Sequence, residues 1–213
     1  MALNIYGKTD TMNENLVIGA DLTGEYDFPV LRPVNYTPKT VITFSDAIRE
    51  RKPRGKWCHF FIDDDKFERI WNAPDKYLQI LQYFDGVITP DFSSYLDMPK
   101  ACQIWNRYRN RVMAYYYQSH GLNIIPTVGW SDEDSFHWCF DGLPENSTLA
   151  VSTNGCFFPD AKQFYINGMI EMERRLKPNR IICVGRKIEV PINTEIIYFN
   201  SFGQDMTKRL RGE

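Results

Sequence analysis

The sequence has 213 residues, of which 43% are apolar and 15% aromatic, a composition that suits one folded domain and argues against disorder. Its 25 basic and 27 acidic residues nearly cancel, so binding to nucleic acid or to an anionic membrane would need a local patch. The first residues contain no basic-then-apolar leader, and no apolar run approaches the roughly 18 residues of a membrane helix. We therefore expect a cytoplasmic protein without membrane contact.

Short β-branched segments alternate with helical segments from about residue 40 onward. Helices are expected near residues 46–50, 67–84, 100–119, 130–137 and 160–176, and Pro74 interrupts the second because proline donates no amide hydrogen. Strands are expected at residues 41–44, 58–62, 86–89, 123–128, 149–153, 180–184 and 195–199, with a further strand at 16–20.

Apolar strands without alternation, separated by helices, predict a largely parallel sheet with helices on both faces. The expected fold is a single α/β domain over residues 1–213, with seven or eight strands. An open doubly wound sheet and a small barrel both fit this strand number, and we favour a barrel-like or partly closed sheet. Residues 21–40 contain three prolines and are expected to form an extended arm over the surface.

Carboxylates in the loops that follow the strands are candidate functional groups, because these loops gather at one edge of a parallel sheet, where ligands bind. Asp64, Asp91 and Asp132 each follow a predicted strand. Together they could hold Mg²⁺ or Mn²⁺ and act as the catalytic residues of a metal-dependent hydrolase. Alternatively, the three aspartates are ordinary N-caps of the helices that follow.

Hydroxyl groups at other strand ends are candidates for binding a phosphate. Ser152 and Thr153 precede Asn154 and Gly155 just before a predicted helix, and Arg186 follows the next strand. Hydroxyls and backbone amides at the start of a helix favour phosphate binding. The segment is not a Walker loop, because it has neither the glycine spacing nor the lysine, and a simple strand-end turn is the alternative.

The helix over residues 100–119 carries polar residues, including Asn106 and Arg109, opposite its apolar stripe, with tyrosines further along. Guanidinium groups bind phosphates and tyrosine rings stack on bases, so this helix is a candidate basic and aromatic patch for a nucleotide or nucleic acid. Alternatively, the arginines are solvated on the surface and the tyrosines pack against the sheet.

Five segments together resemble one known family. They read FDGVITPDFSSYLDMP over residues 84–99, QIWNRYRNR over 103–111, IPTVGW over 125–130, SF over 135–136 and AVST over 150–153. In this order they are similar to the domain of unknown function forty-four seventeen, over about residues 40–185. Members of that family occur in phages, plasmids and Firmicutes-type genomes. The resemblance therefore implies a mobile element, whose accessory proteins often handle nucleic acid or counter host defence.

Our leading hypothesis is a phage or mobile-element accessory protein that binds a nucleotide or nucleic-acid ligand at the carboxyl edge of the sheet. Arg109 is expected to bind the phosphate and Trp130 to stack on a base. The hydroxyl groups of Ser152 and Thr153 are expected to donate hydrogen bonds to the ligand. The alternatives are the metal-dependent hydrolase and a protein-binding inhibitor of a host factor, and the sequence leaves open whether the protein is an enzyme. The expected ligand-binding residues are Asp91, Asn106, Arg109, Trp130, Ser152, Thr153 and Arg186.

Overall fold

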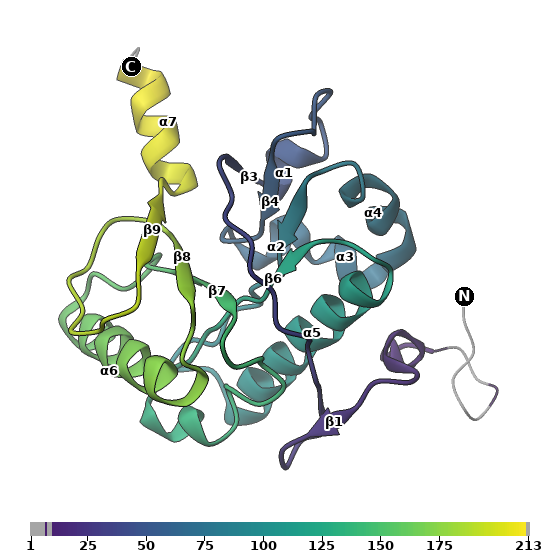
Figure 1. The fold of residues 1–213 in the computed structure, drawn as a ribbon, viewed down its shortest axis with the longest axis horizontal. Coiled ribbons are helices and arrows are strands. Elements are labelled where there is room, and N and C mark those ends of the chain that lie inside the picture. The colour runs from purple at the N-terminus through teal and green to yellow at the C-terminus, as the bar shows by residue number, and fades with distance from the viewer. Residues whose placement is uncertain (1–6, 8–9, 212–213) are drawn as a thin grey trace.

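A computed structural model describes residue 7 and residues 10–211 (Figure 1). Helices and parallel strands alternate along the chain, which confirms the α/β class. The α-helices are α1 (Phe44–Ala47), α2 (Asp64–Phe67), α3 (Arg69–Asn72), α4 (Pro74–Leu81), α5 (Lys100–Ser119), α6 (Pro159–Leu176) and α7 (Phe202–Arg211). The 3-10 helices are η1 (Glu14–Val17) and η2 (Glu133–His137).

The parallel strands form two sheets that follow each other in chain order. The first sheet is β3 (Val41–Thr43), β4 (Trp57–His59), β5 (Gly86–Ile88) and β6 (Ile124–Ile125), and the second is β7 (Thr148–Ser152), β8 (Arg180–Val184) and β9 (Ile196–Phe199). One parallel bridge, Thr127 to Ala150, joins them. The sheets are thus smaller than the seven- or eight-stranded sheet expected. Strand β6 ends at Ile125, because the next residue, Pro126, has no amide hydrogen to extend the ladder.

The two sheets curl around a shared apolar interior. Each strand from β3 to β9 contributes at least one side chain to a single cluster, and no described helix does. The strands form two sheets and no described ladder joins β9 to β3, so the barrel-like or partly closed sheet that we favour from the sequence stays a prediction. The cluster contains Tyr36, Val41, Trp57, Phe61, Ile88, Ile125, Ala150, Ile182, Val184, Ile197 and Phe199.

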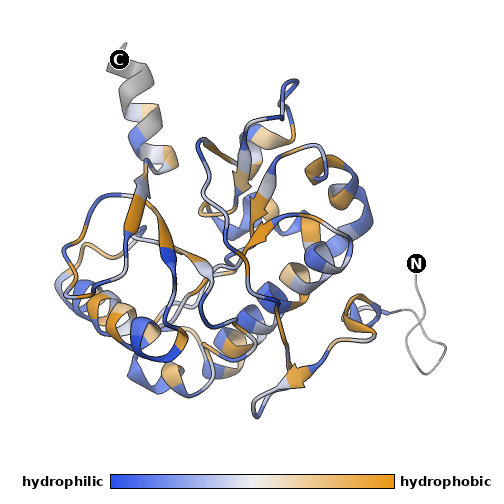
Figure 2. Cartoon of the chain, viewed as in Figure 1, coloured by the Kyte–Doolittle hydropathy of each residue, from blue (hydrophilic) through white to orange (hydrophobic). Residues whose placement is uncertain are grey.

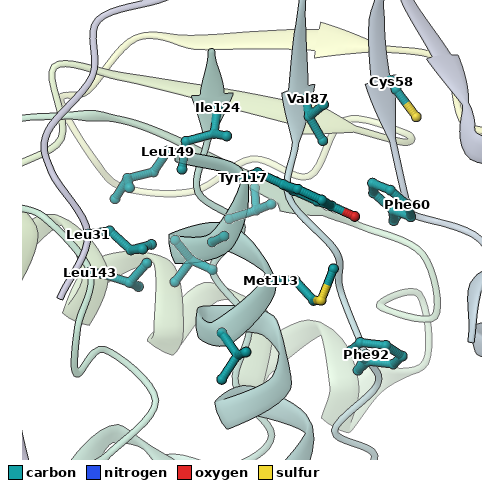
Figure 3. Close-up of a cluster of buried hydrophobic side chains, with 14 of the residues drawn as sticks. Leu31, Cys58, Phe60, Val87, Phe92, Met113, Tyr117, Ile124, Leu143 and Leu149 are labelled. Atoms are coloured by element: carbon teal, nitrogen blue, oxygen red, sulfur yellow. The ribbon is translucent and has the colours of Figure 1, made fainter. Parts of the chain in front are cut away.

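A larger apolar core lies between the outer face of the sheets and the helices (Figure 3). Cys58, Val87 and Ile124 come from three adjacent strands of the first sheet. Met113 and Tyr117 of α5 pack in the same cluster. Because successive strand residues point to opposite faces, one set of apolar residues fills the interior and the other binds the helices.

The segment before the sheets differs in part from the expectation. The strand expected at residues 16–20 is wrong, because residues 14–17 form η1, which begins after Asn13 in the left-handed region. The expected arm at 21–40 contains a short antiparallel pair, β1 (Leu22–Thr23) and β2 (Phe28–Pro29). Beyond it, residues 30–40 have no regular structure, and the Val34 carbonyl accepts a hydrogen bond from the Thr148 amide at 2.7 Å.

Candidate functional site

A pocket of about 420 Å³ lies at the carboxyl ends of β4, β5, β6 and β7. The structure therefore brings four strand-end loops together, and the first turns of α6 form a further wall. Ligand pockets commonly lie at this edge of a parallel sheet and have this size. The polar side chains that line it are Asp63, Asp91, Ser93, Ser94, Tyr95, Arg107, Ser131, Ser152, Asn154, Cys156 and Tyr165.

Arg107 is the buried cation of this pocket. Its guanidinium donates to Asp91 Oδ1 at 3.0 Å, to Ser94 Oγ at 2.8 Å and to the Phe92 carbonyl at 2.6 Å. A Cβ at Gly129 would lie 2.2 Å from Nη1 of Arg107, so only glycine leaves room for the guanidinium there. Arg107 thus fixes the loop after β5 and the position of the Asp91 carboxyl.

Burial raises the pKa of Asp91 above its ordinary value, and the nearby Asp64 carboxylate adds to the rise. The Arg107 guanidinium acts in the opposite direction and offsets part of the effect. Asp64 itself accepts hydrogen bonds from the Ser93 amide at 3.1 Å and from the Ser93 hydroxyl at 2.9 Å. Asp64 therefore anchors the loop, while Asp91 lines the pocket.

The polar face of α5 points into the molecule and not to solvent. In Figure 2 hydrophilic residues are spread along α5 even though this helix lies among other elements. Asn106 donates to the Ser93 carbonyl at 2.6 Å, Asn110 accepts from the Phe92 amide at 2.8 Å, and Gln103 donates to the Tyr95 carbonyl at 3.0 Å. The face satisfies the buried backbone of the loop over residues 92–95.

Arg109, expected to hold phosphate, does not line the pocket. Its guanidinium donates to Glu68 at 2.7 Å and to Asn106 at 2.8 Å, and lies 3.7 Å from the centroid of the Phe92 ring. Its Nε is buried without a hydrogen-bond partner among the described residues. The basic and aromatic patch expected on this helix is thus internal, and Arg107 is the arginine that reaches the pocket.

The two hydroxyl residues at the end of β7 lie in different places, Ser152 at the pocket and Thr153 in the interior. Ser152 lines the pocket and its hydroxyl donates to the Val184 carbonyl at 3.0 Å. Thr153 is buried and donates to the Arg186 carbonyl at 2.9 Å, so it joins the turn to the loop after β8. The Arg186 guanidinium lies 3.8 Å from the centroid of the Phe157 ring, outside the residues that line the pocket.

Trp130 lines the pocket and is held by α6. Its indole nitrogen donates to the Phe164 carbonyl at 3.0 Å, and its ring packs near Tyr165 and Phe140. A Cβ at Gly168 would lie 2.0 Å from the indole ring, so this glycine allows the close contact. The partly buried indole therefore presents a fixed aromatic wall.

Cys156 also lines the pocket, next to the start of α6. Burial raises the pKa of its thiol to about 11, and the Asp91 carboxyl adds to the rise. A thiol with this pKa is protonated at neutral pH and lacks the thiolate of a nucleophile.

Asp64, Asp91 and Asp132, which the sequence predicts as metal ligands, make different contacts in the structure. Asp132 caps η2 by accepting from the Ser135 amide at 3.1 Å, as the N-cap alternative expects. Within the described part of the chain, no group of three or more His, Cys, Asp or Glu side chains is placed to hold a metal ion. Asp91 alone of the three lines the pocket.

Arg107, Asp63 and Cys156 line the pocket but are not among the site residues expected from the sequence. Arg107 lies in the QIWNRYRNR segment that carries the family resemblance, and Asp63 directly follows a strand. The family segment and the strand-end position were visible in the sequence, but neither distinguished Arg107 or Asp63 from the polar residues next to it.

Comparisons with known proteins place the chain in one family. The family model described as Domain of unknown function (DUF4417) matches residues 20–202. The "Gene 1 protein" of Mycobacterium phage D29 is 35% identical over 184 residues, 84% of this chain and 67% of the relative. The "Gene 1 protein" of Mycobacterium phage L5 is also 35% identical over 184 residues, 79% of its length. No solved structure matches, and no described helix is long and apolar enough to cross a membrane. The chain belongs to the DUF4417 family, which has relatives in mycobacteriophages.

Proposed function

We propose that the chain binds a nucleotide, free or within a nucleic-acid strand, in the pocket at the carboxyl edge of the strands. The observation that carries this proposal is the combination of groups in one cavity. Aromatic rings, a carboxyl next to a buried guanidinium, and a turn at the start of a long helix all line it. A nucleotide has a complementary set, namely a flat base, N–H donors and an anionic phosphate.

The base is assigned to the aromatic side of the pocket. Trp130 and Phe61 line it from two different loops, and Tyr95 lies at an exposed position on the loop after β5. Asp91 offers a carboxyl oxygen to a base N–H, and its ion pair with Arg107 at 3.0 Å offsets the negative charge that it would present to a phosphate.

The phosphate is assigned to the turn over residues 152–156 and to the start of α6. Ala161, in the first turn of this helix, lines the pocket, and first-turn amides lack intrahelical partners. The Gly155 amide also has no hydrogen-bond acceptor among the described residues, and Gly155 adopts a φ of 78° that glycine tolerates.

A thermal-shift screen with nucleosides and nucleoside mono-, di- and triphosphates tests the proposal, because a ligand of the native state raises the melting temperature. Asp91→Asn keeps a hydrogen-bond acceptor for Arg107 but removes the carboxylate, and Asp65→Asn is the exposed control outside the pocket. We expect a nucleotide to stabilise the wild type and Asp65→Asn more than Asp91→Asn. Equal shifts in all three proteins, or no shift with any nucleotide, would exclude the assignment.

A further inference from the structure

The loop between α1 and β4 concentrates positive charge. Residues 49–56 read RERKPRGK, with five cations and one carboxylate, in a chain with a formal net charge of -2. Arg49, Arg51, Lys52 and Arg54 are exposed, and their side chains form no hydrogen bond or ion pair with any described residue. The fifth cation, Lys56, pairs with Glu50 at 2.6 Å.

The carboxylates around this loop accept hydrogen bonds from backbone amides of the loop and from the Thr43 hydroxyl. Glu50 accepts from the Lys52 amide at 2.7 Å, and Asp85 accepts from the Gly55 amide at 2.9 Å. Asp46 accepts from the Thr43 hydroxyl at 3.1 Å. The loop is therefore fixed in shape, and four of its cations face solvent without a partner among the described residues.

Three of these cations, Arg49, Arg51 and Lys52, border an open hollow with a volume of about 610 Å³. The loop enters β4 at its amino end, whereas the candidate nucleotide pocket lies at the carboxyl ends of the strands. The two cavities have no lining residue in common. The hollow is lined by Ile42, Asp46, Arg49, Glu50, Arg51, Lys52 and Lys56.

We propose that the loop over residues 49–56 is a docking surface for the phosphodiester backbone of double-stranded nucleic acid. The loop presents four solvent-facing cations in a fixed arrangement. Cations of this kind neutralise the closely spaced phosphates of a duplex, and this supplies most of the free energy of binding that is independent of base sequence. The exposed large apolar side chains of the described residues all lie outside this loop. Stable binding to an anionic membrane usually combines such charges with an apolar anchor.

The binding is expected to be independent of base sequence. The loop contains no aromatic ring that could stack on a base, and its cations are suited to phosphates, which position a protein without reading sequence. This surface is independent of the nucleotide pocket, so either proposal can fail without the other.

Fluorescence anisotropy with labelled duplexes of about 20 base pairs, in two unrelated sequences and over roughly 50 to 200 mM salt, tests the proposal. The test variant is Arg51→Gln/Lys52→Gln/Arg54→Gln. A matched control, Lys66→Gln/Lys100→Gln/Arg174→Gln, removes the same charge from exposed cations that pair with carboxylates elsewhere. All six side chains are exposed, and circular dichroism checks that both variants fold.

We expect the wild type to bind both duplexes alike and the test variant to bind at least about ten-fold more weakly. A plot of the logarithm of the association constant against the logarithm of salt concentration has a negative slope. For the test variant this slope should be less negative by roughly three, because the variant neutralises three fewer phosphates. The control should bind like the wild type. Equally weakened binding by the two variants would assign the effect to overall charge and overturn the proposal. Undetectable binding of the wild type to either duplex at the lowest salt concentration would also overturn the proposal. So would binding of the wild type to phosphatidylserine vesicles as tightly as to the duplexes.

Discussion

Arg107 determines the geometry of the pocket, because one buried guanidinium holds Asp91, Ser94 and the Phe92 carbonyl together. Replacing it with methionine leaves these groups without their donor while keeping most of the side-chain volume. We expect Arg107→Met to lower the free energy of unfolding in urea by about 3 kcal/mol, the cost of breaking a buried pair. Combining it with Asp91→Asn should cost less than the sum of the single changes, since the two groups interact directly. Additive effects would show that they are not coupled.

His59 makes the stability of the protein depend on pH. It is buried in β4, where its Nδ1 accepts from the Phe61 amide at 3.2 Å, and burial lowers its pKa from 6.5 to about 4. Below pH 6.5 the unfolded chain takes up a proton at this imidazole that the folded chain does not, so stability decreases between about pH 6.5 and 4. The decrease from His59 alone should approach about 3 kcal/mol.

Urea unfolding at several pH values measures this dependence. His59→Asn places an amide oxygen near the position of Nδ1 but does not titrate. The difference in unfolding free energy between wild type and His59→Asn should therefore shrink or reverse as the pH falls. A difference that stays constant from pH 7 to 4 would contradict a neutral buried His59.

At the residue scale, the expected ligand-binding residues are divided between the pocket and the interior of the protein. Asp91, Trp130 and Ser152 line the pocket, whereas Arg109 is internal and Arg107 is the arginine that lines the pocket. Residues 107 and 109 are about 200° apart around the helix axis, so their Cβ atoms leave α5 on different sides, although both guanidinium groups reach Phe92. Both lie among polar residues in the sequence, so the pattern could not show which of them faces the pocket.

At the scale of elements, α6 packs against Trp130, which lines the pocket. Gly168→Ala places a methyl group against the indole, which must then move with its loop. We expect a decrease of about 1 to 3 kcal/mol in the unfolding free energy and a changed tryptophan emission, although alanine favours a helix by about 1 kcal/mol.

Gly203→Ala in α7 is the matched control, because the nearest atom to its Cβ lies 4.0 Å away. This change should leave stability unaltered or slightly raised. If both glycine variants behave alike in chemical denaturation, the packing of α6 on Trp130 does not matter for stability.

The polar face of α5 explains why element patterns gave a misleading picture of the site. A helix with an apolar and a polar face ordinarily presents the polar face to water. Here Gln103, Asn106 and Asn110 bond the loop after β5, which has no sheet partner for its backbone among the described residues. Amino-acid type alone does not tell whether a polar side chain meets water or a buried backbone group.

At the scale of the whole molecule, the two sheets should unfold together. A single bridge joins them, but the larger apolar core includes Val87 from the first sheet, Val151 from the second and Met113 from α5. We expect coincident urea transitions by tryptophan fluorescence and far-ultraviolet circular dichroism, as for one domain. Separate transitions would contradict the prediction of a single domain over the whole chain.

The fold class was predictable because its signal is repeated in several of the parallel strands. Segments such as Leu149–Val151 and Ile181–Cys183 are apolar without alternation, which is typical of parallel strands covered on both sides. The division into two sheets depends on local breaks, such as Pro126 after a two-residue strand. Which loops then meet at the carboxyl edge follows from how far the sheets curl, and that depends on packing across the whole interior.

The most direct test of nucleotide binding in this pocket is a titration followed by the indole N–H signals of the five tryptophans in nitrogen–proton NMR spectra. Trp130→Phe assigns the signal of the pocket tryptophan. With the nucleotide that stabilises the protein most, the Trp130 signal should move in a saturable way, while those of Trp71 and Trp105, which pack against each other outside the pocket, should not. Movement of the Trp71 and Trp105 signals with an unchanged Trp130 signal would place the ligand elsewhere and contradict the assignment.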